Sequence, residues 1–253
     1  MAAKMEKQKK SKQFGLIGKN ISYSFSQKYF SNKFIKEELS NCSYENFDLK
    51  SIEEFSDIFK SNPNIKGLNV TIPYKEVIFP HLDKLNSKAK RIGAVNTIRV
   101  TKKGKLKGYN TDEYGFRKSL APHLKKHHKK ALILGTGGAS KAIAFALKKL
   151  HIQYQFVSRS TNGSYNYDSL TSEIIATHHL IINCTPLGTF PNINDCPNIL
   201  YEAITDQHLL YDLIYNPEET AFLKKGKDQG ATTVNGLRML ELQAEKAWKI
   251  WNK

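Results

Sequence analysis

Short apolar runs alternate with amphipathic stretches along most of the chain, and this alternation predicts its secondary structure. Short runs of branched apolar residues are typical of buried strands, whereas apolar positions that recur every three or four residues are typical of helices. In the first half the pattern predicts strands at 14–17, 44–49 and 69–72, helices at 27–39 and 52–60, and a hairpin within 94–110 turning at Gly104. In the second half it predicts strands at 131–135, 155–158, 180–184 and 209–214, and helices at 139–150 and within 235–251.

Strands that alternate with helices imply βαβ units and a largely parallel sheet. The alternation occurs as two series, one starting at Gln13 and one at Ala131, with the polar sequence HHKK directly before the second. The sequence therefore predicts an α/β protein in two parts. The first is an α/β domain with a mostly parallel sheet, and the second is a Rossmann-type, doubly wound nucleotide-binding domain.

Composition places the chain among ordinary soluble proteins, with 253 residues, 40% hydrophobic and 25% charged. No apolar run approaches the ~20 residues of a membrane-spanning helix, and the basic N-terminus has no hydrophobic stretch behind it, so we expect neither a membrane span nor a secretory signal. Cys42, Cys184 and Cys196 are odd in number and form no CxxC pair. This favours reduced thiols in the cytoplasm over a disulfide framework, and no metal site is predicted.

The net charge of +16 raises the possibility of nucleic-acid binding. The basic residues are spread over an N-terminal lysine tail and the segments 101–108, 123–130 and 148–149, and aromatic residues do not alternate with them. This distribution favours a solvated basic surface over a base-stacking platform. A diffuse positive field would also attract a small anionic substrate. A nucleic-acid-binding protein on a Rossmann scaffold stays as a remote alternative.

The segment ALILGTGGASKAIAFAL places Gly135, Gly137 and Gly138 between a predicted strand and a predicted helix. Glycines at this position allow a tight turn and let backbone N–H groups approach a diphosphate at the N-terminus of a helix. Ser140 stands where the dinucleotide fingerprint has its third Gly or Ala. The segment predicts a dinucleotide site, and the alternative is a turn that only packs a helix on a sheet.

The end of the next strand bears on the choice between NAD and NADP. An NAD-preferring domain has Asp or Glu there to bind the ribose hydroxyls. Here the sequence is FVSRST, with Ser158, Arg159 and Ser160 and no acid. A guanidinium suits a 2′-phosphate, so the segment favours NADP. The alternative for Arg159 is an exposed loop residue.

Polar residues also follow the predicted strands of the first half, where open α/β sheets build ligand sites. They are Ser24 and Ser26 in ISYSFS, Asn69, Thr71 and Lys75 in NVTIPYK, Asn96 in GAVNT, and Asn110, Thr111 and Asp112 in GYNTD. Several have an ordinary structural explanation: the serines and Thr111 or Asp112 are possible helix caps, Asn96 a possible turn residue, and Lys75 a possible surface lysine. Together they describe a cleft suited to a small polyhydroxylated acid.

These motifs, in this order, resemble the shikimate dehydrogenase family. The resemblance extends from Phe14 to about Trp251 and rests on an ordered series of segments. They are SxS after the first strand, NVTIPYK, GAVNT, NTD, LGTGGAS, SRS, INCTPLG, YDLIYNPEET and NGLRMLELQAEKAW.

The resemblance implies a role for each matched residue. Ser24 and Ser26 would bind the substrate carboxylate, and Lys75 and Asp112 would form the catalytic pair beside the carbonyl group. The ring hydroxyls would be held by Thr71, Asn96 and Gln243. The cofactor would contact Gly135, Gly137, Gly138, Ala139, Ser158, Arg159 and Ser160, with Tyr215 at the substrate and Gly236 near the nicotinamide end.

The family resemblance also implies an activity and a domain arrangement. The activity is reversible NADP-dependent reduction of 3-dehydroshikimate to shikimate, a step of aromatic amino-acid biosynthesis, in a cytoplasmic monomer or homodimer. Residues 13–112 and 237–253 would form the substrate domain, because the last helix returns to it, and residues 113–236 would form the NADP domain. Residues 1–12 would be a disordered basic tail.

The chain departs from the family pattern at several positions. Asn20, Tyr23 and Gln27 replace Pro, His and Pro around the two serines, Ser158 replaces an Asn, and the second basic residue after Arg159 is absent. An NAD-preferring quinate/shikimate dehydrogenase therefore stays open as the nearest alternative.

Overall fold

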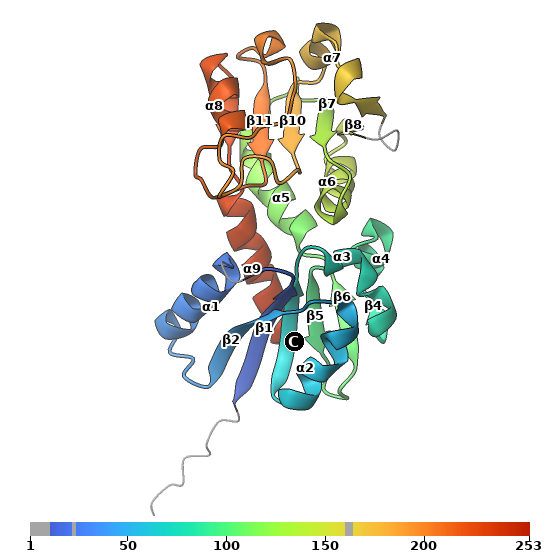
Figure 1. Cartoon of the computed structure of the whole chain (residues 1–253), viewed down its shortest axis with the longest axis vertical. Coiled ribbons are helices and arrows are strands. Elements are labelled where there is room, and N and C mark those ends of the chain that lie inside the picture. Colours follow the sequence, from blue (N-terminus) through green and yellow to red (C-terminus); the bar gives the residue numbers. More distant parts are fainter. Residues whose placement is uncertain (1–10, 22–23, 160–163) are drawn as a thin grey trace, which may run out of the picture. The chain divides into compact units, whose positions relative to one another are not determined.

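The computed structural model describes residues 11–21, 24–159 and 164–253. The described chain divides into two compact units. The first comprises residues up to 91, 95–109 and 247–253, and the second comprises 92–94 and 110–246. Each unit has its own six-stranded sheet (Figure 1).

The first unit is built on a mixed sheet with the strand order β2-β1-β3-β5-β6-β4. Its strands are β1 (Lys12–Gly18), β2 (Cys42–Asp48), β3 (Ile65–Val70), β4 (Lys84–Leu85), β5 (Thr97–Val100) and β6 (Leu106–Tyr109). Its helices are α1 (Phe25–Lys36), α2 (Phe55–Ser61), α3 (Tyr74–Val77) and α4 (Ser87–Ile92), with 3-10 turns η1 (Ile52–Glu54) and η2 (Phe79–His81). β1 runs parallel to β2 and β3, whereas the hairpin β5–β6 is antiparallel.

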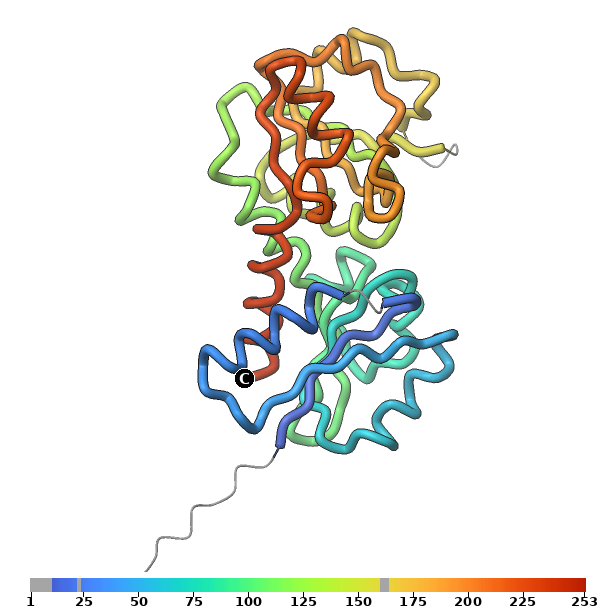
Figure 2. The backbone as a smooth tube through the Cα atoms, turned by 60° about the vertical axis from the view of Figure 1, so that its left-hand side comes forward, coloured from blue at the N-terminus to red at the C-terminus, as the bar shows by residue number. Residues whose placement is uncertain are grey.

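Helix α1 and the last turns of α9 (Leu237–Trp251) cover one face of this sheet (Figure 2). The Trp251 ring stacks on Phe14 with centroids 5.0 Å apart, and its Nε1 donates to the carbonyl of Ile98 at 2.9 Å. A Cβ on Gly67 would lie 2.1 Å from the Trp251 ring, so β3 needs glycine at this position. The last helix therefore returns to the first unit, as predicted.

The opposite face of the same sheet packs against α2, α3 and α4. Phe55 and Ile58 of α2 and Ile78, just after α3, belong to one buried cluster with Ile17 and Leu68 of the sheet. With helices on both faces, the central strands are buried on both sides, which explains their nearly continuous apolar sequences.

The second unit has a sheet in which neighbouring strands are parallel, in the order β12-β11-β10-β7-β8-β9. Its strands are β7 (Lys130–Leu134), β8 (Gln153–Ser158), β9 (Tyr165–Asn166), β10 (Leu180–Asn183), β11 (Leu209–Asp212) and β12 (Thr232–Val234). Its helices are α5 (Asp112–Leu120), α6 (Gly138–Lys149), α7 (Ser172–Thr177), α8 (Ala221–Asp228) and the first part of α9, with 3-10 turns η3 (Ala121–His123), η4 (Tyr167–Ser169) and η5 (Tyr201–Ala203).

This strand order is that of a doubly wound sheet. The chain starts in the middle at β7, runs outward through β8 and β9, and returns to build β10, β11 and β12 on the other side. The order reverses between β7 and β10, and ligands of such sheets bind at the carboxyl ends of the strands at this switch point. The predicted α/β class with a Rossmann-type second part is confirmed.

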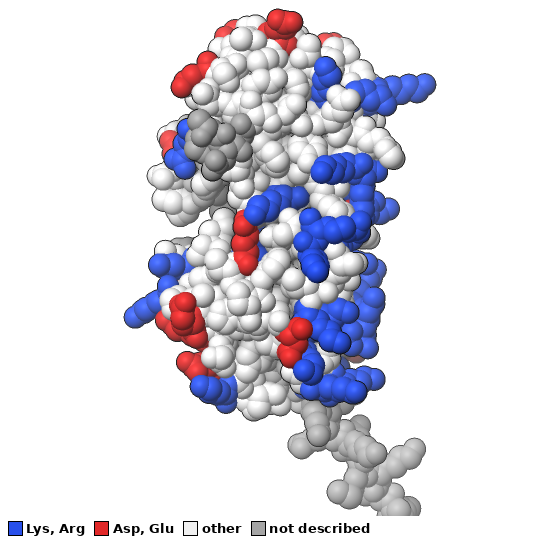
Figure 3. All heavy atoms as spheres, turned by 90° about the vertical axis from the view of Figure 1, so that its right-hand side faces the viewer, with Lys and Arg blue, Asp and Glu red and all other residues white. Residues whose placement is uncertain are grey.

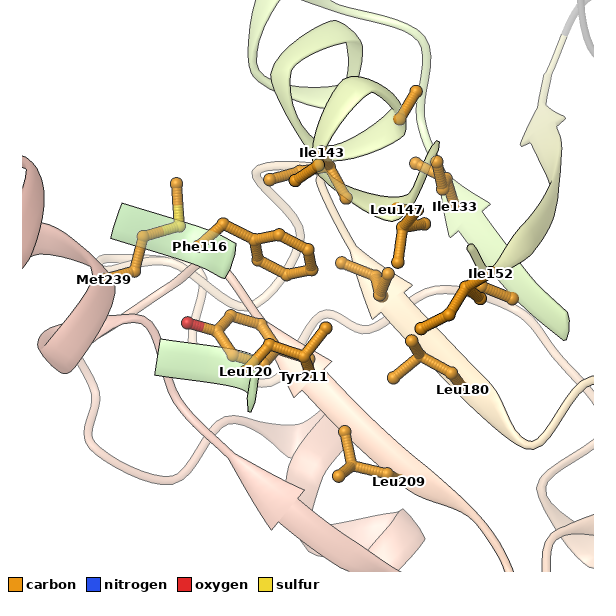
Figure 4. Close-up of a cluster of buried hydrophobic side chains, with 14 residues drawn as sticks. Phe116, Leu120, Ile133, Ile143, Leu147, Ile152, Leu180, Leu209, Tyr211 and Met239 are labelled. Carbon is orange, nitrogen blue, oxygen red and sulfur yellow. The ribbon is translucent and has the colours of Figure 1, made fainter. Parts of the chain in front are cut away.

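Two apolar layers hold the helices to this sheet. On one face, Phe116 of α5 and Ile143 and Leu147 of α6 surround Tyr211 and Leu180 (Figure 4). The Tyr211 hydroxyl lies 2.6 Å from Ser119 Oγ, so the one polar atom of this large buried ring is satisfied. The other face packs against α7 and α8. No helix within the described residues is both long and apolar enough to cross a bilayer.

Strand β3 shows why periodicity alone misplaced one element. The pattern predicts a strand at 69–72, but β3 runs from Ile65 to Val70. Its first half contains Lys66 and Gly67, which interrupt the apolar run. The Trp251 ring fills the space that a side chain at position 67 would occupy. The apolar group at this point of β3 therefore comes from α9, which is far away in sequence.

The division into units differs from the predicted domain limits at three places. Residues 92–94, 110–112 and 237–246 group with the second unit, whereas the sequence predicts them in the first domain. For the last two ranges the reason is local, because α5 and α9 approach closely at Gly115, where a Cβ would lie 2.5 Å from the Met239 carbonyl. The assignment of substrate and cofactor to the two domains stays a prediction.

Candidate active site

Ser24 and Ser26 lie at the start of α1, in the first unit. Ser24 is the N-cap, and its Oγ accepts from the backbone N–H of Ser26 at 3.2 Å. Ser26 is buried, and its hydroxyl bonds the Tyr44 phenol, which donates to Asn69 Oδ1 at 2.8 Å. Burial raises the pKa of Tyr44, so the phenol keeps its proton and acts as a donor. Ser24 therefore caps α1, which the sequence allowed. Ser26 is connected to the sheet through Tyr44 of β2.

Lys75 lies in the short helix α3, directly after β3 ends. The preceding residue, Tyr74, is buried and donates from its hydroxyl to the Leu49 carbonyl at 2.7 Å. The Lys75 carbonyl accepts from Val95 N at 2.8 Å, and the Thr71 carbonyl accepts from Tyr74 N at 2.9 Å. Lys75 and Thr71 are both half-buried. The lysine thus extends, half-buried, from a backbone that is hydrogen-bonded on both sides.

Asn96 is buried and directly precedes β5, and its backbone bonds β3 on one side and β6 on the other. Its Oδ1 accepts from Thr97 Oγ1 at 3.0 Å, and its carbonyl accepts from Val70 N at 2.9 Å and from Asn69 Nδ2 at 3.3 Å. Its own N–H donates to the Tyr109 carbonyl at 3.0 Å. Asn96 therefore links the ends of β3 and β6, and its side chain lies at the carboxyl end of β3.

These contacts form one continuous hydrogen-bonded chain from Ser26 through Tyr44 and Asn69 to Asn96. The structure thus brings together polar residues that are up to seventy positions apart in sequence. A chain of this kind stiffens its members, and stiff hydrogen-bonding groups suit a site that must orient several substrate hydroxyls.

Asp112 and Gln243 lie in the second unit, on helices α5 and α9. Thr111 precedes α5 and its Oγ1 donates to Gln243 Oε1 at 3.2 Å, so its side chain does not cap the helix. The Asn110 side chain takes that task instead and accepts from Glu113 N at 3.3 Å. Asp112 and Gln243 are both buried. The partnership of Asp112 with Lys75, which belongs to the other unit, stays a prediction.

The glycine turn follows β7 at the switch point. Gly135 has φ +101°, a left-handed conformation that favours glycine, and its N–H donates to the Val157 carbonyl at 2.8 Å. Gly137 is the N-cap of the twelve-residue helix α6, and no atom lies within 4 Å of where its Cβ would be. Ser140 is buried and donates to the Gly137 carbonyl at 2.6 Å, so the replacement for the usual third glycine braces the turn.

The loop after β10 meets this turn. A Cβ on Gly135 would lie 3.2 Å from Thr185 Cγ2. Thr185 is held by Asn183, whose Oδ1 accepts from Thr185 N at 2.9 Å and from Thr185 Oγ1 at 2.6 Å. The INCTPLG motif thus lies beside the glycine turn at the switch point. The sequence alone did not predict this position for any of its residues.

Asp212, at the end of β11, connects the INCTPLG loop to the loop that follows β11. Its Oδ1 accepts from Asn183 Nδ2 at 3.1 Å and from Ile214 N at 3.0 Å, and its Oδ2 accepts from Thr220 Oγ1 at 2.7 Å. Asp212 is fully buried, and burial raises its pKa to about 6 although its three hydrogen bonds oppose the rise. The only sequence signal for it was a charged residue inside an otherwise apolar strand.

Tyr215 and Gly236 are brought together by the same loop. The Gly236 N–H donates to the Ile214 carbonyl at 2.9 Å, and a Cβ on Gly236 would lie 2.1 Å from the Leu213 carbonyl oxygen. Glycine is therefore required for backbone contact here. Its predicted proximity to the nicotinamide stays a prediction, as does substrate contact by the half-buried Tyr215.

The residues predicted to choose between NAD and NADP end β8. Ser158 is buried and Arg159, the one described residue directly after β8, is exposed. Ser160 lies outside the described residues. The donors and the geometry fit a dinucleotide with an extra phosphate. The turn at Gly135 and Gly137 offers backbone N–H groups at a helix N-terminus, and Arg159 offers a guanidinium.

The chain is similar in sequence and in fold to proteins of known activity. Residues 16–98 match the family model described as the shikimate dehydrogenase substrate binding domain. A relative named shikimate dehydrogenase (NADP(+)), from Methanosphaera stadtmanae, is 38% identical in an alignment that covers 94% of this chain and 90% of the relative.

Solved structures are similar over nearly the whole chain. Shikimate dehydrogenase from Aquifex aeolicus has a TM-score of 0.84 at 35% identity, covering 96% of this chain and 92% of that one. Shikimate 5-dehydrogenase from Thermus thermophilus, in complex with NADP(H) and shikimate, has a TM-score of 0.84 at 29% identity, with 95% and 93% covered. Quinate dehydrogenase from Corynebacterium glutamicum, in complex with NAD, has a TM-score of 0.85 at 25% identity, with 96% and 94% covered.

The doubly wound sheet, the glycine turn at its switch point and the polar set of the first unit define a dinucleotide-dependent oxidoreductase of the α/β class. With relatives of this identity and coverage, the chain belongs to the shikimate dehydrogenase family.

Proposed function

We propose that the chain catalyses the reversible, NADP-dependent reduction of 3-dehydroshikimate to shikimate. The observation that carries the proposal is the hydrogen-bonded chain from Ser26 to Asn96 beside Lys75. It offers hydroxyl and amide groups with one cation, which is the chemistry that a polyhydroxylated carboxylic acid requires. The names of the relatives and their bound ligands support the same substrate and cofactor.

The reaction needs a hydride at the ketone carbon and a proton at the ketone oxygen. NADPH, when bound along the turn at Gly135 and Gly137, supplies the hydride. We propose that the Lys75 ammonium group hydrogen-bonds the ketone oxygen and gives it a proton as the alkoxide develops. Asp112 would orient the lysine and the adjacent hydroxyl. In the reverse direction Lys75 takes the proton from the hydroxyl group.

Substrate orientation comes from the remaining polar residues. Ser24 and Ser26 would donate to the carboxylate, while Thr71, Asn96 and Gln243 would bind the ring hydroxyls and Tyr215 would contact the substrate. Gln243 Oε1 accepts from Thr111 Oγ1 at 3.2 Å, which fixes the side-chain amide at the start of α5. Such fixed donors lower the entropic cost of placing the ketone beside the hydride.

The cofactor preference rests on Ser158, Arg159 and Ser160. A guanidinium pairs with a 2′-phosphate, and no described acid directly after β8 opposes it. Ala139 and Gly138 would place their backbone against the diphosphate, and Gly236 would lie at the nicotinamide end. We also propose that the enzyme works in the cytoplasm, since its three cysteines are free thiols, and that it is a monomer or a homodimer.

The test is absorbance at the nicotinamide band with purified protein, shikimate, and either NADP or NAD. We expect reduction of NADP with shikimate and weak or no reduction with quinate. Faster reduction of NAD with quinate would instead assign the chain to the quinate-preferring branch of the family. No reduction of either cofactor by either substrate would reject the enzymatic proposal, and a steeply salt-dependent affinity for DNA or RNA would then favour the nucleic-acid alternative.

A further inference from the structure

Strand pairing in the first unit places three cationic side chains side by side. Arg99 on β5 pairs with Lys107 on β6, and Lys107 pairs with Lys84 on β4. Residues that are directly opposite one another project from the same face of a sheet, and neighbouring strands lie about 4.8 Å apart. Like charges in such positions repel each other. The row is therefore not explained by a benefit to sheet stability.

The row lies on the face that α9 covers further along the sheet. Arg99 also pairs with Gly67 on β3, and the side of Gly67 that a Cβ would occupy faces the Trp251 ring. At β3 the Trp251 ring thus covers this face of the sheet. On the same face, Lys84 of β4 is exposed and Arg99 of β5 is half-buried. The cations occupy an uncovered part of a face whose neighbouring strands are packed against a helix.

The β5–β6 turn adds further positive charge to the row. Its shape is fixed by Thr101, whose carbonyl accepts from Gly104 N at 2.9 Å and whose Oγ1 accepts from Lys105 N at 3.0 Å. Gly104 has φ +73°, as the predicted turn requires. Lys102 and Lys103 lie at the exposed tip of this turn. A hydrogen-bonded turn therefore carries these charges.

Residues of β4, β5 and the turn, together with Lys253, line an open hollow of about 380 Å³. Six of its seven lining residues are basic and none is acidic: Lys84, Arg99, Lys102, Lys103, Lys105 and Lys253, with Thr101 as the seventh. Among the described ion pairs, one joins this set to an acid, where Lys105 Nζ lies 3.2 Å from Asp83 Oδ1. Figure 3 shows Lys and Arg side chains gathered on one side of the unit. The sequence spreads these residues from 84 to 253, and the fold gathers them.

We propose that this basic hollow binds a compact anion with several phosphate groups, of the triphosphate class. The chemistry is complementary, because ammonium and guanidinium groups bind phosphate oxygens by charge-assisted hydrogen bonds. Its volume is in the range of small-molecule sites. The lining includes no aromatic residue for stacking bases and no apolar residue for entering a membrane, which disfavours a nucleic-acid strand and a lipid surface. The proposal is independent of the dehydrogenase activity.

The test is isothermal titration of the full chain with inorganic tripolyphosphate at about 0.15 M salt, with saturating NADP present to occupy the dinucleotide site. We expect binding that weakens about tenfold or more in Lys102→Ala/Lys103→Ala and in Arg99→Ala. The matched control is Lys125→Ala/Lys126→Ala, another pair of adjacent exposed lysines, which lies in the second unit. Its affinity should equal that of the unmodified chain, and circular dichroism would confirm that each variant is folded.

Further ligands separate the sources of the triphosphate group. Equal affinity for ATP and tripolyphosphate would support a nucleoside triphosphate as the ligand, and clearly weaker binding of ATP would support an inorganic polyphosphate. The proposal fails if tripolyphosphate does not bind at this salt concentration, or if the control pair weakens binding as much as the turn pair does. It also fails if a single-stranded DNA oligonucleotide binds more tightly than tripolyphosphate and loses affinity in the same variants.

Discussion

The side-chain amide of Asn183 donates to the Asp212 carboxylate at 3.1 Å, and this bond connects two neighbouring strands of the Rossmann sheet where both end. From Asn183 the network continues to Thr185, beside the glycine turn, and from Asp212 it continues to Thr220, the N-cap of α8. One buried pair thus sets the positions of the two loops that follow β10 and β11. Both loops lie at the edge of the sheet where the cofactor is proposed to bind.

Two replacements of Asp212 distinguish the contribution of its hydrogen bonds to stability from the contribution of its charge. Asp212→Ala leaves three donors without their acceptor, on Asn183, Ile214 and Thr220, so we expect a loss of roughly 3–5 kcal/mol in the free energy of unfolding. Asp212→Asn keeps an oxygen for the first two donors and should lose less. Urea unfolding measures both, and equal losses in the two variants would contradict the hydrogen-bond account.

The charge of Asp212 gives a pH dependence of known sign. Its pKa in the folded protein is about 6, above the ~3.8–3.9 of an unfolded chain. Its contribution to stability is therefore fully present below about pH 3.8 and is lost as the pH rises through about 6. Asp212→Asn does not titrate, so its stability relative to the unmodified protein should improve by as much as roughly 3 kcal/mol between pH 4 and 7. A constant difference across that range would show that burial does not raise this pKa.

Lys75 is the residue whose replacement should affect chemistry most. If it supplies the proton, Lys75→Ala lowers kcat by about a hundredfold or more, while the KM for shikimate changes less. Lys66→Ala is the matched control, because Lys66 is an exposed lysine on β3 of the same unit. Steady-state kinetics of both variants decide the question. A raised KM with unchanged kcat in Lys75→Ala would make Lys75 a binding residue only.

Two glycines should respond to alanine in opposite ways. Gly137 has open space around its Cβ position and φ −73°, so Gly137→Ala should change the free energy of unfolding by less than about 1 kcal/mol. Its methyl group would occupy space beside the proposed diphosphate, and the Kd for NADPH should rise at least about tenfold. Gly236→Ala should instead destabilise the fold by about 2 kcal/mol or more, since its Cβ would clash with the Leu213 carbonyl. NADPH fluorescence titration and urea unfolding together test the contrast.

Arg159 should determine cofactor preference without affecting the fold. Because it is exposed, Arg159→Ala should leave thermal stability within about 1 °C to 2 °C of the unmodified protein. Loss of a charge-assisted bond to the 2′-phosphate should raise the KM for NADPH roughly tenfold to a hundredfold and leave the KM for NADH unchanged. An equal rise for both cofactors would place Arg159 at the diphosphate instead.

Acid should destabilise the second unit through buried histidines. Burial lowers the pKa of His128 to about 4, and its Nδ1 accepts from Lys125 N at 2.9 Å, a bond that protonation breaks. His208 has the same arrangement with Thr205 N, and burial also lowers its pKa. This stability is present above about pH 6.5 and is lost as the pH falls towards 4, by up to roughly 3 kcal/mol for His128.

The measurement is urea unfolding from pH 7 to pH 4 in the Asp212→Asn background, which removes the opposing titration of Asp212. His128→Gln should flatten the loss of stability over that range. The same slope in both proteins would show that His128 is not a source of the acid sensitivity.

Much of the fold could be predicted from sequence because its signals are local. The apolar strand, the glycines and the alanine-rich helix around Gly135 lie within one short segment, and the structure has β7, the turn and α6 there. The helix α7 and the strand β12 were missed because they are too short to show a period, and the eight-residue helix α8 was also not predicted. β3 was misplaced because Trp251, far away in sequence, fills the space above Gly67.

The sequence by itself determined the two α/β series, the glycine turn and the ordered polar motifs, since each depends on neighbouring residues. Only the tertiary structure decided which of these residues meet. It paired Asn183 with Asp212, placed Gln243 beside Thr111, and aligned Lys84 with Lys107. Such contacts depend on strand order and helix packing, and no local pattern encodes which distant strand or helix supplies a residue's partner.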